Sequence, residues 1–374
     1  MLTHALEADP AIEVVGVAAN GIIALARIEQ LKPDAVTLDI EMPEMNGFET
    51  LKQIRLRHDH IRVIMFSTLT ERGASATLEA LAAGADDYVT KNSNQGSFDH
   101  SLDRLRAELI PKIKQFFAVA KTPPPALSLP AIEKRPAPSA PFIPRAIRGP
   151  HIAPAVIVIG VSTGGPAALA RIMPSFPAGF PVPILIVQHM PPLFTKLLAD
   201  RLNDICPLHV REASEGALIS PGDVWIAPGD FHMRIALRGK ELRIRLDQGP
   251  PENSCRPAVD VLFASAAAQF ESRVLAAVLT GMGRDGQRGA ALLKAKGATV
   301  LAQDEESCVV WGMPGSVVQD GSADAVVPLD EIPNEIMARI PGCLFLNRAS
   351  NFTGKSSVDA PGAFGRMKEA PCPR

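Results

Sequence analysis

The sequence predicts two domains of the α/β class, each built around a mostly parallel sheet. Short β-branched runs alternate with helical patterns over residues 1–117 and again over residues 153–342, as in successive βα units. Near-continuous apolar runs such as residues 183–187 are typical of strands buried on both faces of a doubly wound sheet. Residues 231–246 predict an antiparallel hairpin within the second domain.

The expected elements follow from this alternation of patterns. In the first domain we expect a helix over residues 2–8 and strands over residues 13–17, 35–38, 62–66 and 88–91, with helices between them. In the second domain we expect strands over residues 155–160, 183–188, 223–227, 231–236, 242–246, 274–280, 298–301 and 325–327. Helices are expected there over residues 167–173, 193–203, 257–269, 286–296 and 331–340.

Two segments differ in composition from the domains. Nine prolines in residues 122–150 favour an extended, semi-rigid linker over residues 118–152, with a proline-rich ligand for a partner domain as the alternative. Residues 343–374 have no clear periodicity, and we expect a disordered tail.

Composition excludes several classes of protein. Hydrophobic residues make up 47% and charged residues 21% of the 374 residues, with a net charge of −2, so no global positive field attracts nucleic acid or anionic lipid. No apolar run approaches the ~20 residues that cross a bilayer, and no signal peptide is recognisable. We therefore expect a cytoplasmic protein without membrane insertion. The five cysteines lack C-x-x-C spacing, which argues against a disulfide framework or a structural zinc site.

Ser162 is the first candidate for chemistry. It follows an apolar strand pattern, lies within the G-x-S-x-G sequence of residues 160–164, and precedes a helical pattern. Such a serine lies at the carboxyl end of a buried strand, where α/β sheets bind their ligands. A glycine-flanked serine is also common in ordinary turns, so the pattern leaves both interpretations open.

A nucleophilic serine needs a base and an orienting acid. His189 directly follows a buried strand and therefore lies at the same sheet edge as Ser162, whereas His151, His209 and His232 are expected to be structural or solvated. Asp285 follows a third strand and would supply the acid, although an aspartate before a helix is often only an N-cap. A lone histidine at a strand end is likewise often structural.

Three polar residues also follow strands of the first domain. Asp39, Ser67 and Lys91 end successive strands, and a carboxylate, a hydroxyl and an ammonium in one crevice would suit an acyl-phosphate. Residues 38–47, 65–68 and 83–91 resemble response-regulator receiver domains, which have a flavodoxin-like fold. The resemblance implies that Asp39 accepts the phosphoryl group, that Ser67 and Lys91 contact it, and that Tyr88 is the switch aromatic.

The receiver resemblance is incomplete at the N-terminus. The first strand of that family, with its two Mg²⁺-binding acids, is missing, and we expect either a start codon upstream of Met1 or a degenerate receiver. Asp39 would then hold Mg²⁺ with little help from the protein, so phosphorylation should be weak and the receiver should cover the active site poorly. A second departure is Asn92, where the family usually has proline.

The second domain resembles the chemotaxis protein-glutamate methylesterases, the CheB family. The resemblance lies in residues 160–166, 188–190, 255–263, 279–286 and 302–314, and the order Ser162, His189, Asp285 differs from that of α/β-hydrolases. It implies a catalytic triad that hydrolyses glutamate 5-methyl esters, and often deamidates glutamines, on methyl-accepting chemotaxis receptors. No metal or cofactor is implied for this step.

The resemblance also implies further roles. A histidine kinase would donate the phosphoryl group to the receiver, which controls the esterase. Backbone N–H groups of Met282 and Thr163 are candidates for the oxyanion hole, and Arg256 either contacts an acidic receptor surface or is an ordinary surface arginine.

Two alternatives stay open. One is an esterase or amidase acting on another protein. The other is a non-enzymatic phosphate-responsive module in which the turn at Ser162 binds a nucleotide phosphate, although that turn lacks the G-K-[ST] and G-x-G-x-x-G patterns.

Overall fold

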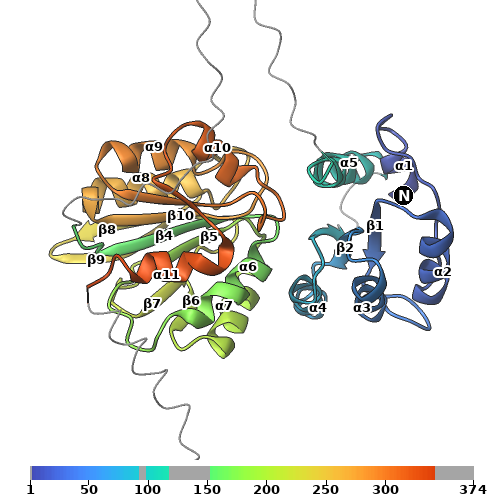
Figure 1. Cartoon of the computed structure of the whole chain (residues 1–374), viewed down its shortest axis with the longest axis horizontal. Helices are drawn as coiled ribbons and strands as arrows, with labels where there is room; N and C mark the ends of the chain where they lie inside the picture. The colour runs from blue at the N-terminus through green and yellow to red at the C-terminus, as the bar shows by residue number, and fades with distance from the viewer. Residues whose placement is uncertain (1, 92–97, 118–151, 342–374) are drawn as a thin grey trace, which may run out of the picture.

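A computed structural model describes residues 2–91, 98–117 and 152–341, which form two α/β domains (Figure 1). The expected linker, apart from Ile152, and the expected tail lie outside the described residues. No helix in the described ranges has both the length and the apolar character needed to cross a membrane.

The first domain has a parallel three-stranded sheet with the order β1-β2-β3. The strands are β1 (Ala35–Asp39), β2 (Arg62–Thr68) and β3 (Asp87–Lys91), and the helices are α1 (Leu2–Leu6), α2 (Gly21–Leu31), α3 (Gly47–Arg57), α4 (Glu71–Ala82) and α5 (Phe98–Lys114). Helix α3 begins with a capping box, in which Asn46 and Glu49 each accept a hydrogen bond from the other's backbone N–H. This cap fixes the helix start directly after the loop that follows Asp39.

The strand expected over residues 13–17 is wrong, because that segment is irregular. Strand β1 pairs only with β2 in the described chain, so residues 13–17 have no neighbouring strand. Val15 and Val17 are exposed. An apolar, β-branched run satisfies its backbone groups as a strand only when another strand pairs with it.

The second domain is organised around a parallel seven-stranded sheet with the order β12-β11-β10-β4-β5-β7-β6. Its strands are β4 (Val156–Val161), β5 (Ile184–Gln188), β6 (His209–Glu212), β7 (Asp223–Ile226), β10 (Val274–Val278), β11 (Thr299–Gln303) and β12 (Ala325–Val327). Helices cover both faces of the sheet (Figure 1). They are α6 (Gly165–Ile172), α7 (Phe194–Ile205), α8 (Val259–Phe270), α9 (Gln287–Ala295), α10 (Met313–Gln319) and α11 (Ile332–Met337).

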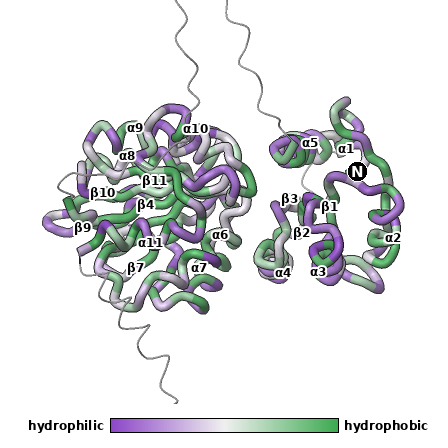
Figure 2. Tube along the Cα trace, viewed as in Figure 1, coloured by the Kyte–Doolittle hydropathy of each residue, from purple (hydrophilic) through white to green (hydrophobic). Residues whose placement is uncertain are grey.

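The residues of strand β4 show why helices must cover both faces of the seven-stranded sheet. All of its residues are buried, and they alternate between two cores. Ile157 and Ile159 pack in the core that contains α6 and α7, whereas Val156 and Val158 pack in the core that contains α8 and α9. Because side chains alternate across a strand, an apolar residue is needed at every position. Figure 2 shows the resulting hydrophobic strands at the centre of the domain.

The α/β fold class and the predicted hairpin are confirmed. Strands β8 (His232–Arg238) and β9 (Glu241–Asp247) pair antiparallel as a separate two-stranded sheet. The sequence did not predict helix α10, whose second and third residues are Pro314 and Gly315. Glycine disfavours a helix, but proline is tolerated in its first turn.

The two domains contact each other in the described structure. Helix α4 lies against α6 and α7, and the ring of Tyr88 stacks on Phe194 with centroids 4.9 Å apart and an angle of 11° between the planes. Such a pair contributes about 0.5–1.5 kcal/mol beyond its buried area. The amino end of β3, where Tyr88 lies, therefore faces the second domain.

Candidate active site

Ser162 lies directly after β4, in the turn that leads to α6. Its N–H donates to Thr280 O at 2.9 Å, and the Gly165 N–H donates to Ser162 O at 2.8 Å. A methyl group on Gly281 would lie 2.6 Å from Ser162 Cβ, so only glycine permits this close approach. The loop after β10 thus packs directly on the serine turn.

His189 occupies the equivalent position on the neighbouring strand. Strands β4 and β5 pair with Val161 opposite Gln188, so Ser162 and His189 are the next residues beyond a paired position. Asp285 comes from the loop after β10, which pairs with β4 on its other side. The adjacent strands β10, β4 and β5 therefore bring the predicted nucleophile, base and acid to one sheet edge.

His189 and Asp285 form a close pair. His189 Nε2 lies 2.8 Å from Asp285 Oδ2, and the Asp285 side chain is 2% exposed. The carboxylate also accepts hydrogen bonds from the Val259 N–H at 2.6 Å and from the Asp260 N–H at 3.0 Å. Burial alone would raise the pKa of Asp285, but the hydrogen bond and charge of His189 and these N–H donors lower it.

The other nitrogen of His189 faces a thiol. Cys255 Sγ lies 3.6 Å from His189 Nδ1. Burial would lower the pKa of His189, but its hydrogen bonds with Asp285 and Cys255 and the charge of Asp285 raise it to about 9. The His189 ring is therefore protonated at neutral pH and becomes neutral only as the pH rises through about 9.

Ser162 and His189 line one cavity of about 320 Å³, together with Asp285. Among the described residues, no hydrogen bond joins the Ser162 hydroxyl to the His189 ring. Because Nε2 is occupied by Asp285, only Nδ1 can receive a proton from the serine.

Two backbone donors flank this cavity. The N–H groups of Thr163 and Met282, which the sequence suggested for an oxyanion hole, make no hydrogen bond within the described residues, and both residues line the cavity. The Thr280 hydroxyl donates to Thr163 O at 2.9 Å. This bond ties the serine turn to the Met282 loop and orients the two donors relative to each other.

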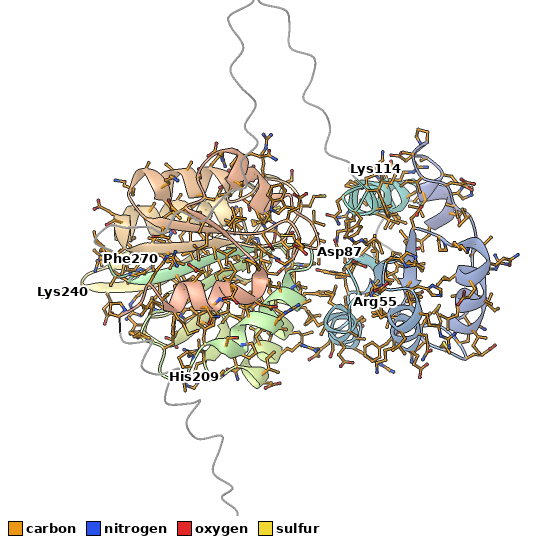
Figure 3. The ribbon with its side chains drawn as sticks, in the orientation of Figure 1. Arg55, Asp87, Lys114, His209, Lys240 and Phe270 are labelled. Carbon is orange, nitrogen blue, oxygen red and sulfur yellow. The ribbon has the colours of Figure 1, made fainter. Side chains whose placement is uncertain are left out.

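The remaining histidines of the described second domain lie elsewhere. His232 is 1% exposed, and its Nε2 lies 3.0 Å from Pro250 O. His209 is exposed at the β6 edge, remote from Asp87 and the facing surfaces of the domains (Figure 3). The third alternative, His151, lies outside the described residues.

Arg256 is held within the second domain. Its guanidinium donates to Asp230 Oδ1 at 2.5 and 3.0 Å and to Gly249 O at 3.0 Å. Its charge is therefore paired inside the chain, an arrangement that favours a structural role over contact with an acidic substrate.

In the first domain, Asp39 and Lys91 are in contact. Lys91 Nζ lies 2.6 and 2.7 Å from the two Asp39 oxygens. Ser67 does not join them, because its buried hydroxyl donates to Gly73 O at 3.0 Å and accepts from Thr77 at 2.6 Å. Tyr88 is 7% exposed, and burial raises its pKa well above the usual value.

The described residues do not fit a Mg²⁺ site at Asp39. Mg²⁺ prefers six oxygen ligands, whereas no cluster of three potential metal-binding side chains includes Asp39 in the described ranges. Its carboxylate oxygens instead accept hydrogen bonds from Lys91.

The first domain lines the cavity at Ser162, contrary to the expectation of poor cover. Leu81, Asp87, Tyr88 and Lys112 all contribute to the wall. The Thr163 hydroxyl donates to Asp87 Oδ2 at 3.0 Å. Figure 3 shows Asp87 on the side of the first domain that faces the second.

Sequence reasoning missed the roles of Cys255, Asn253 and Asp87. Asn253 Nδ2 donates to Asp285 Oδ1 and Asp260 Oδ2, both at 2.9 Å. None of these residues follows the carboxyl end of a strand, which is the position that indicated the triad, so strand order could not have indicated them. An asparagine or cysteine beside an active-site loop has no distinctive spacing.

The fold and site together define a two-domain response regulator whose second domain has the residues of a serine hydrolase. Comparison with known families agrees: residues 157–336 match the CheB methylesterase model, and residues 1–103 match the response regulator receiver domain. The chain belongs to the CheB family of protein-glutamate methylesterases/protein-glutamine glutaminases.

Individual relatives cover nearly the whole chain. The protein-glutamate methylesterase/protein-glutamine glutaminase of Trichodesmium erythraeum is 48% identical over 91% of this chain and 95% of its own length. The protein of the same name from a Nocardioides species is 50% identical over 91% and 92%, respectively. The solved Thermotoga maritima CheB methylesterase catalytic domain is 47% identical, covers 50% of this chain and 98% of that chain, and has a TM-score of 0.48.

Proposed function

We propose that this chain demethylates glutamate 5-methyl esters, and deamidates glutamines, on methyl-accepting chemotaxis receptors in the cytoplasm. The observation that carries the proposal is the 2.8 Å contact between His189 and Asp285 at the cavity that Ser162 also lines. Three adjacent strand ends supply the groups that acyl transfer needs. A phosphate-binding module would have no use for this buried acid–base pair.

His189 Nδ1 is the proposed base. It accepts the Ser162 proton as Oγ attacks the ester carbonyl, while Asp285 holds the other ring nitrogen and stabilises the imidazolium. The imidazolium then gives its proton to the departing methoxide. Methanol is released, and the glutamyl group stays bound to Ser162 as an acyl-serine. Water attacks this ester with His189 again as base, which releases glutamate and restores the serine. With glutamine, ammonia leaves in place of methanol.

Backbone N–H groups would stabilise the negative oxygen that forms during each attack. Thr163 and Met282 each carry a backbone donor that makes no hydrogen bond within the described chain, and both residues border the cavity. Loss of one such donor typically costs about 10²–10³ in kcat. No metal or cofactor is required for this step.

The first domain would control access to Ser162. Its Asp87 and Tyr88 form part of the cavity wall, so separation of the domains would open the site to a receptor helix. A histidine kinase is the proposed phosphodonor for Asp39, and Lys91, which lies 2.6 Å from that carboxylate, would contact the phosphoryl group.

Replacement of Ser162 tests the proposal. Ser162→Ala should abolish methanol release from methylated receptor membranes, because the neighbouring hydroxyl, that of Thr163, is bonded to Asp87, while circular dichroism shows retained folding. Ser175→Ala, at an exposed serine after α6, is the matched control and should retain wild-type activity. Unchanged methanol release by Ser162→Ala would refute the serine mechanism. Release of methanol from other methyl-esterified proteins, but not from receptors, would favour the broader esterase.

A further inference from the structure

One cluster of potential metal ligands lies beside the serine. His189, Cys255 and Asp285 each offer a ligand atom, and these atoms all lie within 4.8 Å of one another. It is the only group of this kind in the described residues. The proposed hydrolysis by Ser162 has no step that involves the Cys255 thiol. The position of this thiol beside His189 Nδ1 therefore suggests a second role.

We propose that His189 and Cys255 reversibly bind a thiophilic divalent cation of the Zn²⁺ type. Zinc binds imidazole nitrogen at about 2.0–2.1 Å and thiolate sulfur at about 2.3 Å with tetrahedral angles, which places two such ligand atoms roughly 3.6 Å apart. His189 Nδ1 and Cys255 Sγ are 3.6 Å apart. The thiol proton and the Nδ1 proton of the imidazolium both pass to solvent as the metal–sulfur and metal–nitrogen bonds form.

Asp285 completes the arrangement from the other side of the ring. A metal-bound histidine usually donates its second N–H to a carboxylate, which fixes the ring orientation. His189 Nε2 faces Asp285 at 2.8 Å, and the carboxylate is itself held by the Val259 and Asp260 N–H groups. The ring is therefore already oriented with Nδ1 toward the thiol.

The cation has access and room for further ligands. Two cavities, of about 320 and 420 Å³, are both lined by His189 and Cys255. Ser162 borders the smaller one, so its hydroxyl and water can occupy the remaining positions. With two side-chain ligands rather than four, the site is reversible and not structural.

Bound metal would stop hydrolysis because it occupies His189 Nδ1, the atom that must receive the Ser162 proton. This consequence rests on the proposed function, whereas metal binding does not. The experiment therefore measures binding and activity separately.

Cobalt(II) is the probe, because a cobalt–thiolate bond produces a charge-transfer absorption band. The full chain should bind one Co²⁺ with this band, Zn²⁺ should displace it, and Zn²⁺ should inhibit methanol release. Cys255→Ser should lose the band and bind about tenfold or more weakly. Cys206→Ser, at another half-buried cysteine, should behave as wild type. Cys255→Ala and circular dichroism separate loss of a ligand from misfolding.

The possible outcomes distinguish failure of the metal-binding proposal from failure of the proposed function. Absence of the band in the wild type, or an unchanged band in both folded Cys255 variants, overturns the proposal even if the chain hydrolyses esters. A band that depends on Cys255 supports metal binding even if no ester is hydrolysed, in which case the proposed function fails alone.

Discussion

Thr163 Oγ1 donates a hydrogen bond to Asp87 Oδ2 at 3.0 Å, which joins the residue after the proposed nucleophile to the first residue of β3 in the other domain. Asp87 is 4% exposed and also accepts from Lys112 and Gln115, each at 3.3 Å. Helix α5 and the residue that follows it thus hold the carboxylate in place. A buried acceptor fixed on one domain and a donor on the other form a direct contact over the active-site cavity.

Asp87→Ala should raise the basal esterase rate. The change removes the interdomain acceptor, and one hydrogen bond of about 0.5–1.5 kcal/mol corresponds to a roughly two- to tenfold shift toward separated domains. Methanol release without a phosphodonor measures it. Asp59→Ala, at an acid whose side chain is 93% exposed, is the control. Equal rates for wild type and Asp87→Ala would show that this contact does not restrain the site.

A small phosphodonor such as acetyl phosphate should activate this chain only weakly. The described residues offer a divalent cation one carboxylate at Asp39, which Lys91 contacts at 2.6 Å, and water must supply most of the shell. Methanol release with and without phosphodonor and Mg²⁺ checks this expectation, and Asp39→Asn should remove any remaining response. Activation of several-fold that depends on Asp39 would contradict it.

The rate should increase with pH up to about 9. His189 acts as a base only when neutral, and its contacts with Asp285 and Cys255 raise its pKa to about 9, so the active fraction grows as pH approaches that value. A profile of kcat/KM against pH measures the transition. Cys255→Ala should move it to lower pH, because the contact of Cys255 Sγ with His189 Nδ1 is one of the interactions that raise the pKa of His189. A wild-type transition near the ordinary histidine value of 6.5 would count against this assignment.

The same group makes stability depend on pH. The folded-state pKa of His189 is raised from 6.5 to about 9, so its stabilising contribution is fully present below pH 6.5 and is lost as pH rises through 9. The difference in unfolding free energy between wild type and His189→Gln, from urea titrations, should shrink across this window. A difference that is constant with pH would mean that His189 has the same pKa in the folded and unfolded states.

Most of the correct predictions from the sequence came from locating the strands and the residues that follow them. The apolar runs before Ser162 and His189 identify buried parallel strands, and strand ends of one sheet share an edge. Residues 13–17 show the limit, since their pattern is that of a strand but the described chain offers no partner. A local pattern reports propensity, whereas pairing depends on residues far along the chain.

The contacts of the side chains required the structure. The sequence leaves Arg256 either as a surface arginine or as a residue that contacts the substrate. Its pairing with Asp230, seen only in the structure, favours a structural role. Ser67 lies near the carboxyl end of β2, yet its hydroxyl bonds to α4 because Thr77 and Gly73 O lie beside it. Rotamer and partner depend on packing between elements, which spacing does not encode.

Asp285 also depends on a residue outside the triad. The Asn253 amide donates to both Asp285 and Asp260 at 2.9 Å, and the Gly286 N–H donates to the same two carboxylates at 3.0 Å. These donors lie between two neighbouring negative charges and reduce their repulsion. Asn253 and Ser254 both have a positive φ, of 51° and 63°, so glycine can replace either without backbone strain.

Asn253→Gly should therefore lower kcat by about ten- to hundredfold, with little change in KM, because a hydrogen bond to a charged group contributes about 1.5–3 kcal/mol and Asp285 would hold His189 less firmly. The Asp285 carboxylate would also lose a donor that offsets its negative charge, so it should stabilise the imidazolium more strongly, and the rise of kcat/KM with pH should move to higher pH. Ser254→Gly changes the adjacent residue of the same loop conformation without removing a hydrogen bond to either carboxylate, and it should retain both the rate and the pH profile. If Asn253→Gly lowers the rate with an unshifted profile, or if Ser254→Gly lowers it equally, the loop conformation rather than the amide supports Asp285.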